Sequence, residues 1–184
     1  MVGGALEVSS VLYPGCWVDI APSFVFPRAT YVDIDRRARQ FFADADGVDE
    51  IIAANATDDR PRSVTFLARD YRDDLGLPEQ SFDLLVSLYA GFVSEHCTRY
   101  LRIGGSLLVN PSHGDAAMAS IDPRYQLTAV VRSGNNRYRV DTGNLDDHLV
   151  PRRPSSITVE SLHELGRGVA YTKSPFAYVF QRVR

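Results

Sequence analysis

Three short turns carry the side chains of this 184-residue chain that are best suited to chemistry. The turn Asn110–Asp115 places a hydroxyl, an imidazole and a carboxylate close together, at Ser112, His113 and Asp115. Histidine titrates near neutral pH, so His113 is the candidate general base and Asp115 the candidate that orients its imidazole. In the alternative interpretation, Ser112 and Asp115 cap a short helix over residues 116–120.

Carboxylates also end two apolar runs. Asp33 closes a run that begins at Ala29, and Asp70 follows the run 63–68. A carboxylate at the end of a strand accepts hydrogen bonds from both hydroxyls of a ribose, which makes Asp33 a candidate nucleoside ligand. Asp35 is the alternative ribose ligand, and it is also placed to cap a following helix. The neighbours of Asp70 are charged, so a solvated loop is the other interpretation of that residue.

The third turn runs from Tyr13 to Asp19 and contains Gly15 after a proline. A bound nucleoside needs a turn whose backbone approaches it closely, which favours glycine because it has no Cβ. Gly15 is therefore the candidate for that approach.

The hydrophobic pattern predicts a sheet that would position these turns. Apolar runs separated by about one helix of chain are typical of parallel strands joined by crossovers, because parallel neighbours cannot be joined by a tight turn. An open parallel sheet binds ligands at the carboxyl ends of its strands, where these turns lie. The expected strands are residues 8–13, 29–35, 63–68, 82–88 and 106–110, and the expected helices are 36–43, 48–55 and 92–101.

After residue 120 the pattern changes. Two runs flank a Ser-Gly-Asn-Asn turn, which predicts an antiparallel hairpin. The expected elements are strands 125–131 and 137–141, a loop over 145–154, a helix over 158–165 with Ser156 as N-cap and Gly166 as stop, and a final strand over 176–183.

The stretch Val64–Asn110 resembles the second half of the class I S-adenosylmethionine-dependent methyltransferase domain. In that family an acid ends the third strand, a run of the type Leu-Pro-x-x-Ser-Phe-Asp opens the fourth, and a Leu-x-x-Gly-Gly turn opens the fifth. The corresponding residues here are Asp70, Leu77–Asp83 and Leu101–Gly105. The resemblance implies an α/β, Rossmann-like methyltransferase fold, with a mostly parallel central sheet flanked by helices and an antiparallel C-terminal part.

The length of 184 residues suits one domain with a substantial core, expected over residues 1–184. Residues 1–120 would form the cofactor-binding α/β core, and residues 121–184 the C-terminal hairpin, helix and final strand. Asp83, at the start of a strand and away from the ligand edge, is expected to be structural.

The resemblance assigns S-adenosylmethionine contacts to particular positions. Asp33 would hold the ribose, Asp70 the adenine amino group, and Tyr71 would offer its backbone amide or its ring face. The residues assigned to the cofactor are Tyr13, Gly15, Asp19, Asp33, Asp70, Tyr71 and Ser87.

The first turn departs from the family pattern. Tyr13 stands where the family has an acid, and Trp17 and Asp19 stand where it has glycines. This departure implies either a reshaped methionine pocket in which Asp19 holds the amino group, or a pocket that Trp17 fills. After the fourth strand, Tyr89 is placed to line the transfer pocket or simply to pack.

Composition narrows the classes of function. The net charge of −3 gives no general attraction to nucleic acid or anionic membranes. Two cysteines and four separated histidines show no ligand spacing, so no metal site is expected. No apolar run reaches the ~20 residues of a membrane helix, and Met1–Glu7 lacks the regions of a signal peptide, so we expect a cytoplasmic protein.

The expected function is methyl transfer from S-adenosylmethionine to an acceptor nitrogen, oxygen or carbon. A small-molecule acceptor is preferred over nucleic acid, because the chain has no basic surplus and no Asn/Asp-Pro-Pro-Tyr motif. A homodimer or a protein partner is left open. The alternative is a catalytically degenerate methyltransferase-fold protein that serves as a binding or assembly module. A nicotinamide-dependent oxidoreductase is disfavoured, since no Gly-x-Gly-x-x-Gly follows the first strand.

Overall fold

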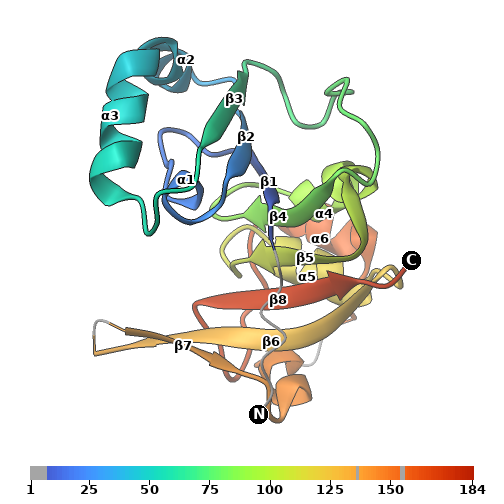
Figure 1. Cartoon of the computed structure of the whole chain (residues 1–184). Helices are drawn as coiled ribbons and strands as arrows, with labels where there is room; N and C mark the ends of the chain where they lie inside the picture. The colour runs from blue at the N-terminus through green and yellow to red at the C-terminus, as the bar shows by residue number, and fades with distance from the viewer. Residues whose placement is uncertain (1–7, 136, 154–155) are drawn as a thin grey trace.

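A computed structural model describes residues 8–135, 137–153 and 156–184 of the chain (Figure 1). Within them, eight strands form one sheet in the order β3-β2-β1-β4-β5-β8-β6-β7. The strands are β1 (Ser10–Pro14), β2 (Arg28–Val32), β3 (Ser63–Leu67), β4 (Phe82–Ser87), β5 (Leu101–Val109), β6 (Tyr125–Gly134), β7 (Arg137–Asp141) and β8 (Ala177–Arg182). The helices are α1 (Pro22–Val25), α2 (Arg36–Ala43), α3 (Ala45–Asn55), α4 (Val93–Cys97), α5 (Asp115–Ile121) and α6 (Val159–Leu165), with 3-10 turns η1 (Thr98–Tyr100) and η2 (Leu145–Leu149).

The sheet is parallel from β3 to β5 and antiparallel beyond it. Strands β3, β2, β1, β4 and β5 pair in parallel, whereas β8 runs antiparallel to both β5 and β6, and β7 runs antiparallel to β6. The final strand of the chain is therefore inserted inside the sheet. The expected α/β fold, with a mostly parallel sheet and an antiparallel C-terminal part, is confirmed.

Alternate residues of each central strand enter cores on opposite faces of the sheet. Val11 and Tyr13 of β1 pack in the cluster that contains Val48 of α3, whereas Leu12 packs in the cluster that contains Val93 of α4. This alternation follows from the two-residue period of a strand. Figure 1 shows the corresponding layers, with α1, α2 and α3 grouped at one end of the sheet and α4, α5 and α6 grouped around β4 and β5.

Several expected boundaries are wrong. Strand β2 ends at Val32 instead of Asp35, α3 begins at Ala45 instead of Val48, and β6 ends at Gly134 instead of Val131. The helix expected over 92–101 is α4 followed by the 3-10 turn η1, and β5 begins at Leu101 instead of Ser106. The early start of β5 includes a register shift opposite Phe82 and a left-handed Gly104 (φ +80°), which let an irregular strand continue through a Gly-Gly pair. Helix α6 is capped by Thr158 instead of Ser156.

The cap of α6 is decided by a reciprocal pair of hydrogen bonds. The Thr158 hydroxyl accepts from the Ser161 amide, while the Ser161 hydroxyl accepts from the Thr158 amide. This capping box gives hydrogen-bond partners to the backbone amides of Thr158 and Ser161, which a cap by Ser156 would leave unpaired. Gly166 (φ +59°) ends the helix as expected.

Other expectations fall partly outside the described residues. Met1–Glu7, Asn136 and Pro154 belong respectively to the expected N-terminal segment, hairpin turn and loop, and they lie outside them. Helix α1 and turn η2 were not predicted; η2 lies within the expected loop 145–154. In the part of the chain that the structure describes, no helix has both the length and the apolar character needed to cross a bilayer.

Asp83 anchors the start of β1 to the start of β4. Its Oδ2 accepts from the amides and hydroxyls of Ser9 and Ser10, each at 2.9 Å, and its Oδ1 accepts from Nε of Arg102 at 2.6 Å. Burial alone would raise the pKa of Asp83, but the Arg102 guanidinium and the serine donors outweigh it and hold the pKa below its usual range. The expected structural role is confirmed.

We expect Asp83→Asn to lower the free energy of unfolding by about 2–3 kcal/mol at neutral pH, because charge-assisted hydrogen bonds are lost. A depressed pKa contributes stability above the unfolded-state pKa and loses it as the pH falls, so the difference between the two proteins should narrow below pH ~4. Urea unfolding measures both effects. Asp147→Asn, at an exposed pair with Lys173, is the control and should cost below about 1 kcal/mol. An equal loss in both variants would contradict the assignment.

Candidate functional site

The turns that follow β1 and β2 are bonded to the strand next to them. The amide of Gly15 donates to the Val32 carbonyl at 2.8 Å, and the amide of Asp33 donates to the Leu67 carbonyl at 3.2 Å. The carboxyl ends of β1, β2 and β3 therefore meet at one edge of the sheet, where an open parallel sheet binds its ligands.

A small cavity opens at this edge, and we call it the β1–β3 cavity. Its volume is about 140 Å³, and it is lined by Gly15, Asp33, Ile34, Arg69, Asp70, Tyr71 and Arg72. Four of the residues assigned to a nucleoside from the sequence thus lie around one cavity. Ile34, which the sequence reasoning missed, is 64% exposed and offers an apolar surface beside Asp33. The signal available in the sequence was an apolar residue between two acids.

Asp33 is held by two backbone amides, one from the turn after β1 and one from its own turn. Its Oδ2 accepts from the Trp17 amide at 2.7 Å and its Oδ1 from the Asp35 amide at 2.8 Å. A carboxylate has about four acceptor sites, so the oriented Asp33 still has capacity for hydroxyl donors. Asp35 instead caps α2 by accepting from the Arg37 amide at 2.7 Å. Hydrogen bonds from Arg37 lower the pKa of Asp35.

Asp70 is bound by a neighbouring arginine. Nε of Arg72 lies 3.0 Å from each carboxylate oxygen, and the Arg72 amide also donates to Asp70. Hydrogen bonds from Arg72 lower the pKa of Asp70. The Arg72 side chain is 64% exposed, so this pair is worth little and rearranges at small cost.

Gly15 satisfies a constraint of the fold itself. Its φ is +67°, and a Cβ at this position would lie 2.7 Å from the Cβ of Ala90. The close approach that requires glycine is therefore between the turn after β1 and the segment after β4. A ligand is not needed to explain Gly15.

Tyr13, Asp19 and Trp17 do not line the β1–β3 cavity, although the Trp17 amide donates to Asp33, which does. Tyr13 is buried, and its hydroxyl donates to Asp19 at 3.1 Å; burial and then the Asp19 charge raise the pKa of Tyr13. Asp19 also accepts from the amide of Ala21, next to α1. The Trp17 ring is half exposed with the guanidinium of Arg37 5.6 Å from its centroid.

A second cavity, the β4–β5 cavity, lies at the ends of β4 and β5. Its volume is about 380 Å³, and it is lined by Tyr89, Asn110, Pro111, Ser112, Arg167, Gly168, Val169, Ser174 and Phe176. Asn110 is buried, and its Oδ1 accepts from the Tyr89 amide at 3.2 Å and from the Ser112 hydroxyl at 2.8 Å. Tyr89 has φ +59° and is 64% exposed, so its ring faces the opening without being packed.

The segment Tyr89–Gly91 separates the two cavities. Ala90 packs against Gly15, and a Cβ on Gly91 would lie 2.7 Å from the Tyr71 hydroxyl, so this side of the segment faces the β1–β3 cavity. Tyr89 lines the β4–β5 cavity on the other side. This short loop therefore borders both cavities.

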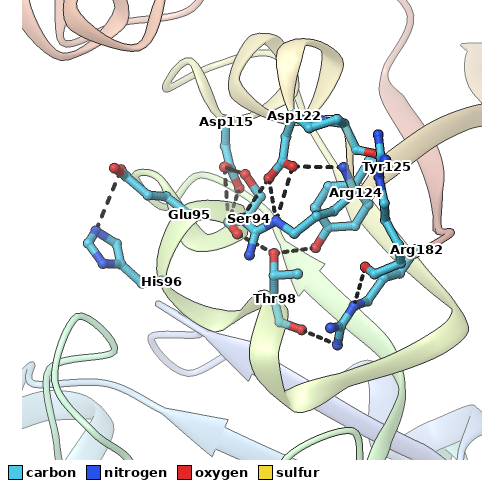
Figure 2. A network of polar contacts seen from close by, with 11 residues as sticks. Ser94, Glu95, His96, Thr98, Asp115, Asp122, Arg124, Tyr125 and Arg182 are labelled. Atoms are coloured by element: carbon cyan, nitrogen blue, oxygen red, sulfur yellow. Dashed lines mark hydrogen bonds and ion pairs between the residues drawn. The ribbon is translucent and has the colours of Figure 1, made fainter.

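Asp115 fixes both ends of that loop, and Figure 2 shows part of its network. Its carboxylate accepts from the Ser87 hydroxyl at the end of β4, from the Ser94 hydroxyl, and from the Ser94 amide at 3.0 Å in the first turn of α4. Asp115 is 1% exposed. Burial raises the pKa of Asp115 to about 6, although the bonds from Ser87 and Ser94 oppose that shift.

The expected Asp115–His113 contact is not made, because Asp115 is directed into the protein. His113 is exposed, and its Nδ1 lies 2.7 Å from the Ser112 hydroxyl. The capping interpretation is also wrong: the N-cap of α5 is Gly114 (φ +93°), with no side-chain hydrogen bond. Ser87, assigned to the cofactor, is buried against Asp115 and lines neither cavity.

Glu95 connects α4 to α6 away from both cavities. Its Oε2 lies 2.9 Å from Nε2 of His163 and 3.8 Å from Nε2 of His96, the contact drawn in Figure 2. Among the described residues, no group of three or more histidine, cysteine or acidic side chains could hold a metal ion.

A scan against protein-family models finds no match, and neither does a search of the curated proteins. Solved structures do match. An rRNA methylase from Streptococcus thermophilus aligns with a TM-score of 0.52 at 10% identity, over 97% of this chain and 89% of that one. An S-adenosylmethionine-dependent methyltransferase from Methanosarcina mazei aligns with a TM-score of 0.51 at 13% identity, over 96% of this chain and 93% of that one.

A third match, the YcgJ protein of Bacillus subtilis, has a TM-score of 0.46 at 18% identity. It covers 62% of this chain and 51% of that one, so this chain spans about half the length of that protein. From the two alignments that span most of both chains, the protein has the fold of class I S-adenosylmethionine-dependent methyltransferases. At these identities the likeness establishes the fold alone.

The raised pKa of Asp115 generates a pH prediction. A group whose pKa is higher in the folded state contributes stability below its unfolded-state pKa and loses it as the pH rises through the folded value. The free energy of unfolding of the native protein, relative to Asp115→Asn, should therefore fall by about 2–3 kcal/mol between pH ~4 and pH ~7. Urea titrations across this range measure the difference, and other carboxylates cancel because both proteins contain them. Parallel curves would contradict the buried-carboxylate assignment.

Proposed function

We propose that this protein transfers a methyl group from S-adenosylmethionine, bound at the β1–β3 cavity, to an acceptor bound at the β4–β5 cavity. The observation that carries the proposal is the gathering of Gly15, Asp33, Asp70 and Tyr71 around one cavity at the ligand-binding edge. The class I methyltransferase fold supports the same reading.

The residues around the β1–β3 cavity fit a nucleoside. Asp33 has acceptor capacity for the ribose hydroxyls, exposed Ile34 suits one face of adenine, and Asp70 suits its amino group. The cavity of about 140 Å³ is smaller than the ~300 Å³ at which ligand pockets usually begin, so the exposed side chains of Arg69 and Arg72 must move aside. Both arginines are at the surface, which makes that movement inexpensive.

The methionine end is the divergent part of the site. We propose Asp19 for the amino group, because its carboxylate is exposed and belongs to the turn after β1. The buried Tyr13 hydroxyl and the Ala21 amide hold Asp19 in place. In this proposal Tyr13 positions Asp19 instead of touching the cofactor.

The chemistry is a displacement. When bound, S-adenosylmethionine supplies a methyl group whose bond to sulfur breaks, leaving its electron pair on sulfur, as the acceptor atom forms its own bond to that carbon. The protein positions the two reactants so that the acceptor atom meets the methyl carbon beside the Tyr89–Gly91 loop, which borders both cavities. Where the acceptor must lose a proton, we propose that Nε2 of His113 takes it. The Ser112 hydroxyl donates to Asn110 and so accepts from Nδ1 of His113, which leaves Nε2 as the basic nitrogen beside the β4–β5 cavity.

The β4–β5 cavity, at about 380 Å³, has room for a ring-sized acceptor. That size suits the small molecule preferred from the sequence, and it equally suits the reacting ring of a larger acceptor. The non-catalytic alternative depended on Trp17 filling the cofactor pocket. Trp17 is half exposed beside Arg37 and is not among the residues that line the β1–β3 cavity, so no specific observation favours that alternative.

Calorimetric titration with S-adenosylmethionine and S-adenosylhomocysteine tests the proposal. We expect binding of both, and a loss of at least about tenfold in affinity for Asp33→Asn, because the ribose loses a charged acceptor worth roughly 1.5–3 kcal/mol. Asp35→Asn is the matched control: it removes the same charge two residues away and preserves the helix cap.

If Asp33→Asn binds S-adenosylmethionine with the affinity of the native protein, the assignment of Asp33 to the ribose is wrong. Absence of binding of either ligand to the native protein would overturn the proposed function.

A further inference from the structure

The hairpin of β6 and β7 extends past its neighbour in the sheet. Strand β8 pairs with β6 only as far as Val131, whereas β6 and β7 continue to pair with each other through Gly134 and Arg137. Figure 1 shows this pair of strands reaching out from the body of the protein. We call the described residues 130–135 and 137–141 the β6–β7 arm.

The arm leaves the sheet at the edge that holds the proposed site. Strand β8 is antiparallel to β5, and β6 is antiparallel to β8, so the last residues of β6 lie at the edge where β5 ends. A side-chain contact confirms the proximity. The ring centroid of Tyr138 on β7 lies 4.8 Å from that of Phe176, which lines the β4–β5 cavity.

One face of the arm gathers arginines. Arg132 and Arg139 are directly opposite each other in the ladder, and Arg137 follows two residues away on the same face of β7. Like charges directly opposite are destabilising in a sheet. The carboxylate near this face, Asp141, pairs with Arg132 at 3.3 Å, and within the described residues Arg137 and Arg139 make no ion pair. The arginines line a hollow of about 730 Å³.

The other face of the arm is aromatic and apolar. Tyr138 and Val140 alternate with the arginines along β7 and are 64% and 70% exposed. Tyr138 contacts Phe176 and still leaves an exposed aromatic surface on the face opposite the arginines. Aromatic rings of this kind stack with unpaired nucleobases, which a duplex does not present.

We infer that the β6–β7 arm binds a single-stranded nucleic acid that crosses the outer edge of β7, the last strand of the sheet. The arginines on one face contact its phosphates, and Tyr138 on the other face stacks against a base. Residues two apart on a strand are ~7 Å apart, and a stacked strand carries a phosphate every ~3.4 Å, so Arg137 and Arg139 reach nearby phosphates. The arm leads to the β4–β5 cavity, and the acceptor of the methyl group is a base of the bound strand. This last assignment, unlike the binding itself, rests on the proposed function.

The net charge of the whole chain does not reveal the positive charge of the arm. The whole protein carries −3, which on its own disfavours polyanions. The arm nevertheless holds three arginines against one carboxylate, and contact with phosphates depends on the local field at the point of contact.

Fluorescence anisotropy with a labelled single-stranded RNA of about 16 nucleotides and mixed sequence tests the inference, without S-adenosylmethionine. We expect the protein to bind this RNA. The logarithm of the association constant should fall with the logarithm of the salt concentration with a slope of about −2, because each of three arginine–phosphate contacts on a single strand contributes about −0.7. The double variant Arg137→Gln/Arg139→Gln should bind at least about tenfold more weakly and lose about 1.4 from the slope. Tyr138→Ala should weaken binding about tenfold with little change in slope.

The matched control is Arg36→Gln/Arg39→Gln, which makes the same change of charge on exposed residues of α2, at the other end of the sheet. It should bind RNA like the native protein. Absence of RNA binding at about 50 mM salt, or an equal loss in both double variants, would overturn the inference. Polyglutamate that displaces the labelled RNA as well as unlabelled RNA does would also overturn the inference, because the arm would then fit an acidic protein segment.

Further measurements test nucleic-acid binding separately from methyl transfer. A duplex of the same sequence should bind more weakly than the single strand, and a single-stranded DNA of that sequence reports whether the sugar is read. Calorimetry should show that Arg137→Gln/Arg139→Gln binds S-adenosylmethionine like the native protein. If the protein binds RNA but not S-adenosylmethionine, the proposed function is wrong and RNA binding by the arm still holds. If it binds S-adenosylmethionine but not RNA, only the inference about the arm is wrong.

Discussion

The structure of the site depends on one buried carboxylate. Asp115 accepts hydrogen bonds from Ser87 at the end of β4 and from Ser94 at the start of α4, and so holds both ends of the loop between them. A buried charge is tolerated only where donors surround it. Those donors come from two elements, which makes the loop geometry a condition of satisfying Asp115. The Tyr89–Gly91 segment lies between Ser87 and Ser94, so the hydrogen bonds of Asp115 to these two serines fix its position.

A second constraint is the insertion of the last strand inside the sheet. Because β8 lies between β5 and β6 and is antiparallel to both, it reverses the direction of the C-terminal half of the sheet. The free end of β6 is thereby brought to the edge where the parallel strands end. The proposed acceptor cavity and the arginine-bearing arm are neighbours for this topological reason, although more than twenty residues of chain separate Asn110 from Arg132.

Sequence reasoning correctly expected Asp33 and Asp70 to lie near each other at one edge of the sheet. Asp33 follows β2 directly and Asp70 follows β3 after two residues, so the period of the strands and the rule for parallel edges were enough to bring them to one cavity. Asp115 was placed in the correct turn but given the wrong partner. The direction of its side chain is decided by Ser94, which lies twenty-one residues earlier in a different helix, and no local pattern reports that contact. Tyr13 and Asp19 likewise bond to each other, on a turn whose spacing suggested ligand contacts.

The sequence by itself determined the α/β class, the parallel strands, most helix positions, and the acids that end β2 and β3, because these follow from local periodicity and turn chemistry. It did not determine the start of β5, where a register shift extends the strand, or the cap of α6, where Thr158 and Ser161 bond reciprocally. Only the tertiary structure decided which polar groups became buried partners, and which arginines of β6 and β7 share one face. Those outcomes depend on contacts between residues that are distant in the chain, whose free energy is set by burial and by pairing across the sheet.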